Sequence, residues 1–107
     1  MDADIRMVYI TCANLEEAKN IGKKIVEERL AACANIIDNI YSFYWWEGKL
    51  QDDKETIIIA KTKNSLVHDL IEKVKSMHSY ECPCIVTLPI LEGNIDFLEW
   101  VVKETKT

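Results

Sequence analysis

The chain has 107 residues with a net charge of −5, and 49% of its residues are hydrophobic. This length fits one domain spanning residues 1–107. The excess of acids argues against nucleic acid as a partner, because phosphate backbones attract basic surfaces. No signal peptide or bilayer-spanning stretch is visible, so we expect a cytoplasmic protein that does not insert into membranes and whose four cysteines stay reduced.

The first elements are predicted to be a strand and a helix. A nearly continuous apolar run over residues 5–12 is typical of a central strand. Asn14 and Glu17 have the spacing of a capping pair at the start of a helix. Apolar residues then recur every three or four positions, which predicts a helix that extends to about Leu30 or Ala32.

A long hairpin is predicted next. Residues 33–46 are rich in β-forming and aromatic side chains, Glu47-Gly48-Lys49 supplies a turn, and residues 56–60 return as a second apolar strand. We expect a bulge or kink at Asp38-Asn39. Both faces of the first strand are apolar, with Ile36, Ile40, Tyr44 and Trp46 expected on one face and Ile37, Tyr41, Phe43 and Trp45 on the other.

This hairpin is too long for the domain that carries it. About 12 strand residues extend roughly 40 Å, whereas a domain of this length has a radius of gyration of about 13 Å. An overhanging two-stranded ribbon is unstable alone in water, so we expect the chain to associate with copies of itself. The expected interface residues are Tyr44, Trp45, Trp46, Glu47 and Trp100.

Four acids surround the hairpin tip, namely Glu47, Asp52, Asp53 and Glu55. We expect them to be solvated charges that keep the hairpin soluble. The alternative is that a subunit interface brings them together as acid–base or cation-binding groups.

The second half of the chain predicts two helices and a strand. Asn64 or Ser65 is expected to cap a helix whose apolar stripe runs from Leu66 to Met77. Residues 84–91 form a last core strand, and residues 95–103 a short terminal helix. The order β-α-β-β-α-β plus a helix predicts an α+β, ferredoxin-like sandwich, with both internal helices on one face of the sheet and the other face bare.

The segment from His78 to Cys84 contains the densest cluster of reactive groups. It combines an imidazole, the Tyr80 phenol, the Glu81 carboxylate and the thiols of Cys82 and Cys84. Imidazole and thiolate together suit zinc or copper, and thiolates favour copper(I). The Cys-x-Cys spacing is not that of a zinc knuckle, and a polar loop that hydrogen-bonds the helix end is the alternative interpretation.

Cys12 ends the first strand and precedes the first helix. A helix N-terminus lowers the pKa of a thiol, which makes Cys12 a candidate metal ligand or reactive thiol. The alternative is a small buried hydrophobic residue. No nucleophile motif, phosphate loop or dinucleotide-binding glycine pattern is present, so we do not expect an enzyme.

Five motifs, in the same order and at compatible spacing, resemble the CutA divalent-cation tolerance proteins. They are Arg29–Ile36, Tyr44–Lys49, Lys61-Thr62, His78–Pro83 and Leu98–Trp100. The resemblance covers about residues 5–102. It implies a ferredoxin-like subunit in a homotrimer whose architecture is similar to that of the PII signalling proteins, with long hairpins paired between subunits.

The resemblance also implies a non-enzymatic role in the response to divalent metal ions, copper especially, with an ion that is not required for folding. Some members bind copper through a thiol and a histidine that match Cys12 and His78 here. Glu81, Cys82 and Cys84 complete the candidate ligands, and Cys84 replaces the usual glutamate. The alternative is a PII-like signalling or scaffolding module that binds a small metabolite or a partner protein.

Overall fold

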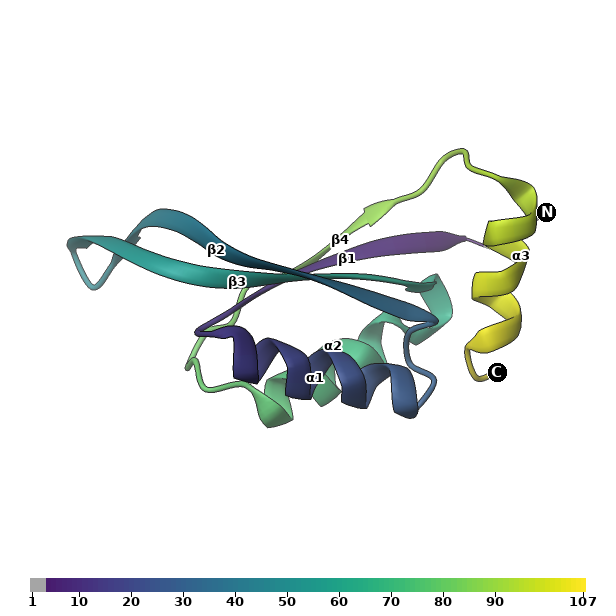
Figure 1. The fold of residues 1–107 in the computed structure, drawn as a ribbon, viewed down its shortest axis with the longest axis horizontal. Helices are drawn as coiled ribbons and strands as arrows, with labels where there is room; N and C mark the ends of the chain where they lie inside the picture. The colour runs from purple at the N-terminus through teal and green to yellow at the C-terminus, as the bar shows by residue number, and fades with distance from the viewer. Residues whose placement is uncertain (1–3) are drawn as a thin grey trace.

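The computed structural model of the protein describes residues 4–107 as a four-stranded antiparallel sheet with helices (Figure 1). The elements are β1 (Ile5–Cys12), α1 (Leu15–Glu27), β2 (Cys33–Trp46), β3 (Lys49–Lys63), a short 3₁₀ turn (Asn64–Leu66), α2 (Val67–Met77), β4 (Ile85–Pro89) and α3 (Ile95–Glu104). The strand order is β2-β3-β1-β4, and α1 and α2 lie side by side beneath one face of the sheet. This arrangement confirms the predicted α+β, ferredoxin-like sandwich.

The main core lies between this covered face and the two helices. Val8 and Ile10 of β1 and Ile58 of β3 are fully buried, because alternate strand residues point to the same face. They pack against Ile25 of α1 and Leu70 of α2, which repeat at helical spacing. Each such side chain stabilises the fold by about 1.5–3 kcal/mol relative to exposure.

Helix α1 ends at Glu27, earlier than the predicted Leu30 or Ala32. Arg29 has a φ of 58°, a left-handed conformation that ends a helix, and the Leu30 N–H donates back to the Ile25 carbonyl at 2.9 Å. Leu30 and Ala32 are nevertheless buried. The prediction that the helix extends to these residues was wrong, because their apolar character reflects burial and not helical structure.

The remaining helices agree with the prediction except at one cap. Asn64 and Ser65 belong to a 3₁₀ turn before α2, and no side chain caps this turn or α2, so the predicted cap was wrong. Helix α3 begins as predicted, and the Asn94 side chain accepts a hydrogen bond from the Asp96 N–H at 3.1 Å. None of the helices in residues 4–107 is both long and apolar enough to cross a membrane.

Helices α1 and α2 leave the opposite sheet face, here called the open face, uncovered, and within residues 4–107 α3 packs only at one end of the sheet, where Leu98 and Val101 contact Ile5 (Figure 1). Strand β4 spans only Ile85–Pro89 and lies at the sheet edge, so the prediction of a core strand over residues 84–91 was wrong. Its open-face residues Val86 and Leu88 are about half exposed, and so is Ile37 of β2. Half-exposed apolar side chains therefore lie on both edge strands of this face.

A β-bulge interrupts β2 at the predicted place. Ile37 pairs with Ile57 and Ile40 pairs with Glu55, so β2 advances one residue more than β3 across Asp38-Asn39. The bulge reverses the alternation of faces beyond it. Beyond the bulge, Ile40, Tyr44 and Trp46 lie on the open face, as Ile37 does before it. Tyr41, Phe43 and Trp45 lie on the opposite face together with Ile36. The predicted face assignment was therefore wrong, because it joined Ile36 to the first group and Ile37 to the second.

The hairpin beyond the bulge, residues 41–54, is here called the arm, and it projects past the core as predicted (Figure 1). The molecule measures 45 × 25 × 22 Å. Glu47 and Gly48 both have positive φ, the conformation of a tight two-residue hairpin turn. Trp45 is 73% exposed and Phe43 is 69% exposed, so the arm presents large apolar groups to water.

Asp38 should fix the bulge, because its Oδ1 accepts hydrogen bonds from the Thr56 hydroxyl at 2.8 Å and the Asn39 N–H at 2.9 Å. We predict that Asp38→Ala lowers the free energy of unfolding by about 1–2 kcal/mol. Glu99→Ala on the exposed side of α3 serves as the control and should cost less than about 0.5 kcal/mol. Guanidinium unfolding at one protein concentration measures both, and equal midpoints would contradict this role of Asp38.

Candidate functional site

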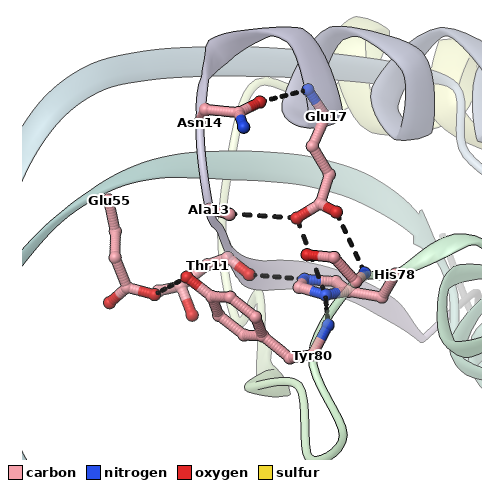
Figure 2. Close-up of polar contacts among 8 residues, drawn as sticks. Thr11, Ala13, Asn14, Glu17, Glu55, His78 and Tyr80 are labelled. Carbon is pink, nitrogen blue, oxygen red and sulfur yellow. Dashed lines mark hydrogen bonds and ion pairs between the residues drawn. The ribbon is translucent and has the colours of Figure 1, made fainter.

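The end of β1 meets the loop that follows α2 at the buried imidazole of His78 (Figure 2). The side chain of His78 has no exposed surface. Its Nε2 lies 2.7 Å from the Thr11 carbonyl, and its Nδ1 accepts the Tyr80 N–H at 3.1 Å. A carbonyl only accepts, so the proton must lie on Nε2. His78 is therefore held as a neutral imidazole with both nitrogens in use.

Glu17 connects the same loop to the start of α1. Its carboxylate accepts hydrogen bonds from the Ala13 N–H at 3.0 Å and from the Ser79 N–H at 2.9 Å (Figure 2). Asn14 caps the helix as predicted by accepting from the Glu17 N–H at 2.8 Å. Sequence reasoning treated Glu17 only as a capping residue, and nothing in its spacing indicated the contact with Ser79.

The electrostatics of Glu17 favour its charged form. Burial alone raises the pKa of this carboxyl, but the hydrogen bonds from Ser79 and Ala13 outweigh that effect, so the pKa of Glu17 lies below its usual value. Glu17 Oε1 also lies 3.7 Å from His78 Nδ1. This contact is not an ion pair, because Nδ1 accepts the Tyr80 N–H and carries no proton of its own.

Cys12 is fully buried beside these two residues. One donor atom each from Cys12, Glu17 and His78 lies within 4.8 Å of the others. Burial raises the pKa of the Cys12 thiol to about 12, with Glu17 and Glu55 adding to the effect. The expectation of a lowered pKa was wrong, because desolvation outweighs the helix N-terminus.

These three side chains have the right donor types for zinc or copper, and in the protein without an ion their polar atoms are already engaged. A ligating thiol is deprotonated, so an ion bound here would have to displace the proton that burial favours on Cys12. The Nδ1 lone pair of His78 and both carboxylate oxygens of Glu17 already accept backbone N–H groups. The structure thus brings Cys12, Glu17 and His78 together, and hydrogen bonds hold the Glu17 and His78 side chains in place.

The other predicted ligands lie outside this cluster. Glu81, Cys82 and Cys84 are exposed and line a pocket of about 660 Å³ between the loop and the arm. Burial is the first cause that raises the pKa of Cys84 above its usual value. Within residues 4–107, no group of three metal-ligating side chains comes together other than Cys12, Glu17 and His78.

The pocket is lined by strands and the arm on one side and by the loop on the other. Its lining residues are Tyr9, Thr11, Tyr41, Ser42, Phe43, Tyr44, Trp46, Glu55, Tyr80, Glu81, Cys82 and Cys84. Half of them are aromatic, and Tyr80 connects the two sides of the pocket. Its hydroxyl donates to Glu55 Oε2 at 2.7 Å (Figure 2).

Glu55 departs most from its predicted role. We expected a solvated charge, but the residue is only 6% exposed. It pairs across the sheet with Ile40 and is two residues from Ile57, so the alternation of β3 points it to the open face. The alternation of β3 was a signal in the sequence that Glu55 faces inward. We missed this signal because Glu55 lies next to the polar residues of the arm.

Two phenols of the pocket remain protonated donors at neutral pH. Burial, followed by the hydrogen bond to Glu55, raises the pKa of Tyr80. The hydrogen bond from Tyr44 to Asp53, at 2.6 Å, raises the pKa of Tyr44 to about 12. Both hydroxyls can therefore donate to carboxylates, and neither is a base.

Comparison with known proteins identifies the family. A sequence profile of the CutA1 divalent ion tolerance protein matches residues 6–104. The chain belongs to the CutA1 family. The resemblance predicted from five motifs is therefore confirmed over nearly the whole chain.

Individual relatives agree in sequence and in structure. The chain is 46% identical to the divalent-cation tolerance protein CutA of Archaeoglobus fulgidus over 88% of its own length and 91% of the relative's. It is also 46% identical to the chloroplastic protein CutA 1 of rice over 94% of its length, but it spans only 56% of that protein. The crystal structure of rice CutA1 superposes with a TM-score of 0.94 at 44% identity, covering 97% of this chain and 95% of that chain.

These names describe divalent-cation tolerance and not an enzyme activity. They also include a chloroplastic member, so CutA1 proteins are not confined to the cytoplasm. The comparisons therefore establish that this chain belongs to the CutA1 family and has the CutA1 fold.

We predict that Glu17→Gln lowers the free energy of unfolding by about 1–3 kcal/mol at pH 7, because two backbone N–H groups lose a charged acceptor. The folded-state pKa of Glu17 is lowered, so its contribution is complete above the unfolded value of about 4.3 and is lost as the pH falls through the folded value. Denaturant unfolding from pH 7 to pH 3 should show the difference from wild type shrinking.

The exposed neighbour Glu16 provides the matched control for this experiment. Glu16→Gln should change stability by less than about 0.5 kcal/mol across the same pH range. Equal effects of the two substitutions would show that the Glu17 hydrogen bonds do not stabilise the fold.

Proposed function

We propose that this CutA1 protein is a non-enzymatic, cytoplasmic homotrimer that takes part in the response to metal ions by binding copper or another divalent cation as cargo. The observation that carries the metal proposal is the exposure of two thiols, Cys82 and Cys84, beside the carboxylate of Glu81 at the pocket. Thiolates favour copper and zinc over magnesium or calcium. The exposed loop is open to an incoming ion without any change in the core.

Accessibility favours this loop over the buried cluster. Cys12 and His78 are predicted ligands by resemblance to the family, but an ion between them would have to break the Tyr80–His78 hydrogen bond and deprotonate a buried thiol. We therefore assign His78 to holding the loop in place and Cys12 to the buried core beside it. Cys82, Cys84 and Glu81 are proposed as the exposed ligands that meet the ion, and the loop would have to rearrange to bring them to one point, because they do not converge in the protein without an ion.

Self-assembly is supported by the apolar surface of the arm and the open face. Tyr44, Trp46 and Trp100 are each about 40% exposed, and Glu47 lies at the exposed tip. Trp45 is 73% exposed, more than a single folded chain in water would favour. The proposed number of subunits, three, comes from the resemblance to CutA proteins. We propose that the interface includes these five residues.

A second candidate function is a PII-like module that binds a small metabolite. The pocket of about 660 Å³ favours it, because this volume lies within the range of about 300–1,000 Å³ that small-molecule sites occupy. The aromatic lining supplies apolar contact, and the carboxylate and hydroxyl groups could fix the orientation of a ligand.

We predict that the double variant Cys82→Ser/Cys84→Ser weakens binding of copper and zinc by at least about tenfold. Calorimetric titration under anaerobic conditions measures the affinities. Cys12→Ser is the control for loss of a thiol elsewhere and should leave the affinities nearly unchanged. Loss of binding in Cys12→Ser or His78→Gln, with full binding in the double variant, would move the site to the buried cluster.

We predict that Trp45→Glu dissociates the assembly, because it places a charge in the proposed apolar contact. Sedimentation velocity at micromolar concentration should show a smaller species than wild type, with the far-ultraviolet dichroism of the fold retained. Lys19→Glu on the exposed side of α1 is the control for a reversed charge and should sediment as wild type does. A monomeric wild-type protein would refute the assembly itself.

A further inference from the structure

We propose that the loop after α2 binds copper as the monovalent cuprous ion, held by the thiolates of Cys82 and Cys84 without a nitrogen ligand. This inference rests on the proposed metal function of the loop and names the ion that the loop takes. It distinguishes this chain from a binder of divalent ions in general, because two soft sulfur ligands suit Cu(I) and leave other ions short of ligands.

The exposure and spacing of the two thiols are the first argument. Cys82 and Cys84 are exposed. Of the other two cysteines, Cys12 is buried and Cys33 is half-buried. A single residue, Pro83, separates the exposed thiols, and a proline favours an extended conformation for the residue before it. Since alternate residues of an extended segment point to the same side, both sulfurs can reach one ion.

The loop is fixed on both sides of these thiols. Before them, the Ser79 N–H donates to the Glu17 carboxylate at 2.9 Å. After them, the Cys84 carbonyl accepts a hydrogen bond from the Thr11 N–H at 3.3 Å, and β4 begins at the next residue. The short stretch between these anchors can adjust, which allows Cys82 to approach Cys84. The anchors themselves keep the loop from moving to distant ligands.

The number of ligands is the second argument. Zinc in proteins is usually tetrahedral, and magnesium and calcium need still more ligands, all of them oxygen. Within residues 4–107, neither Cys82 nor Cys84 belongs to a converging group of three ligating side chains. Cu(I) is a soft ion that two thiolates satisfy, so it does not require a third ligand. The pair of thiols therefore favours Cu(I) over the divalent ions.

Neither of the two histidines supplies a free nitrogen to these thiols. The Nδ1 of His78 accepts the Tyr80 N–H at 3.1 Å, and its Nε2 lies 2.7 Å from the Thr11 carbonyl. His68 is exposed on α2, and no converging ligand group among the described residues contains it. Imidazole suits zinc and copper in general, so a site made of sulfur alone narrows the choice to the softer ion.

Competition with the Cu(I) chelator bathocuproine disulfonate measures the affinity for Cu(I) in the intact assembled protein, kept anaerobic with excess ascorbate. We expect Cu(I) to bind at least about a hundredfold more tightly than zinc does. Cys82→Ser and Cys84→Ser should each lower the Cu(I) affinity by at least about tenfold. Cys33→Ser removes a half-buried thiol elsewhere and should leave this affinity unchanged.

Two further measurements separate the classes of ion. Cys84→Glu introduces the glutamate that is usual in the family by resemblance. It should lower the Cu(I) affinity by at least about tenfold and change the zinc affinity much less, because zinc accepts a carboxylate oxygen. X-ray absorption at the copper edge identifies the ligand atoms directly, and it should show sulfur neighbours without imidazole.

This inference and the proposed metal function fail separately. Equal affinities for zinc and Cu(I), both weakened in Cys82→Ser/Cys84→Ser, would keep the metal function of the loop and reject its preference for Cu(I). Imidazole in the copper spectrum, or full Cu(I) affinity in both single serine variants, would also overturn the inference. An assembled protein that binds neither ion would refute the metal function and this inference together.

Discussion

The candidate site depends on the hydrogen bonds that anchor the loop after α2 to the junction of β1 and α1. Glu17 accepts from Ala13 on one side and Ser79 on the other, and the His78 ring lies between the Thr11 carbonyl and the Tyr80 N–H. The hydrogen bonds to the Glu17 carboxylate are charge-assisted, and such bonds are strong where water is excluded. Because they fix the loop, they also fix where Cys82, Cys84 and Tyr80 can lie.

The anchored loop in turn shapes the pocket. Tyr80 follows His78 by two residues, and its hydroxyl reaches Glu55 on β3. Glu55 faces this pocket because the bulge and the strand alternation place it on the open face, beside the root of the arm. The arm that is proposed to meet a partner subunit also provides walls of this pocket.

The sequence predicted the elements of regular structure well, because each is marked by a local pattern. Asn14 predicted a helix cap, Gly48 predicted a turn, and Asp38-Asn39 predicted a bulge, each from the chemistry of one or two residues. The end of α1 was missed because a left-handed arginine, Arg29, ends the helix, and arginine carries no such signal. Apolar residues beyond it were buried without being helical.

The site was predicted less completely, because its properties arise from long-range contacts. Cys12 and His78 were named correctly as neighbours by resemblance to the family, yet burial reverses the expected pKa shift of the thiol. Glu17 and Glu55 bond to the loop after α2, at positions where the sequence suggested a helix cap and a solvated arm. Their partners are far away along the chain, so no local spacing could identify them.

The protonation of the His78 ring tests this account most directly, because the loop anchor requires one tautomer. Nitrogen-15 chemical shifts of labelled protein at pH 7.5 should show a protonated Nε2 and an unprotonated Nδ1, unchanged when zinc is added. An Nδ1 that carries a proton, or a ring whose shifts follow the zinc concentration, would contradict the structural role of His78 and return it to the metal ligands.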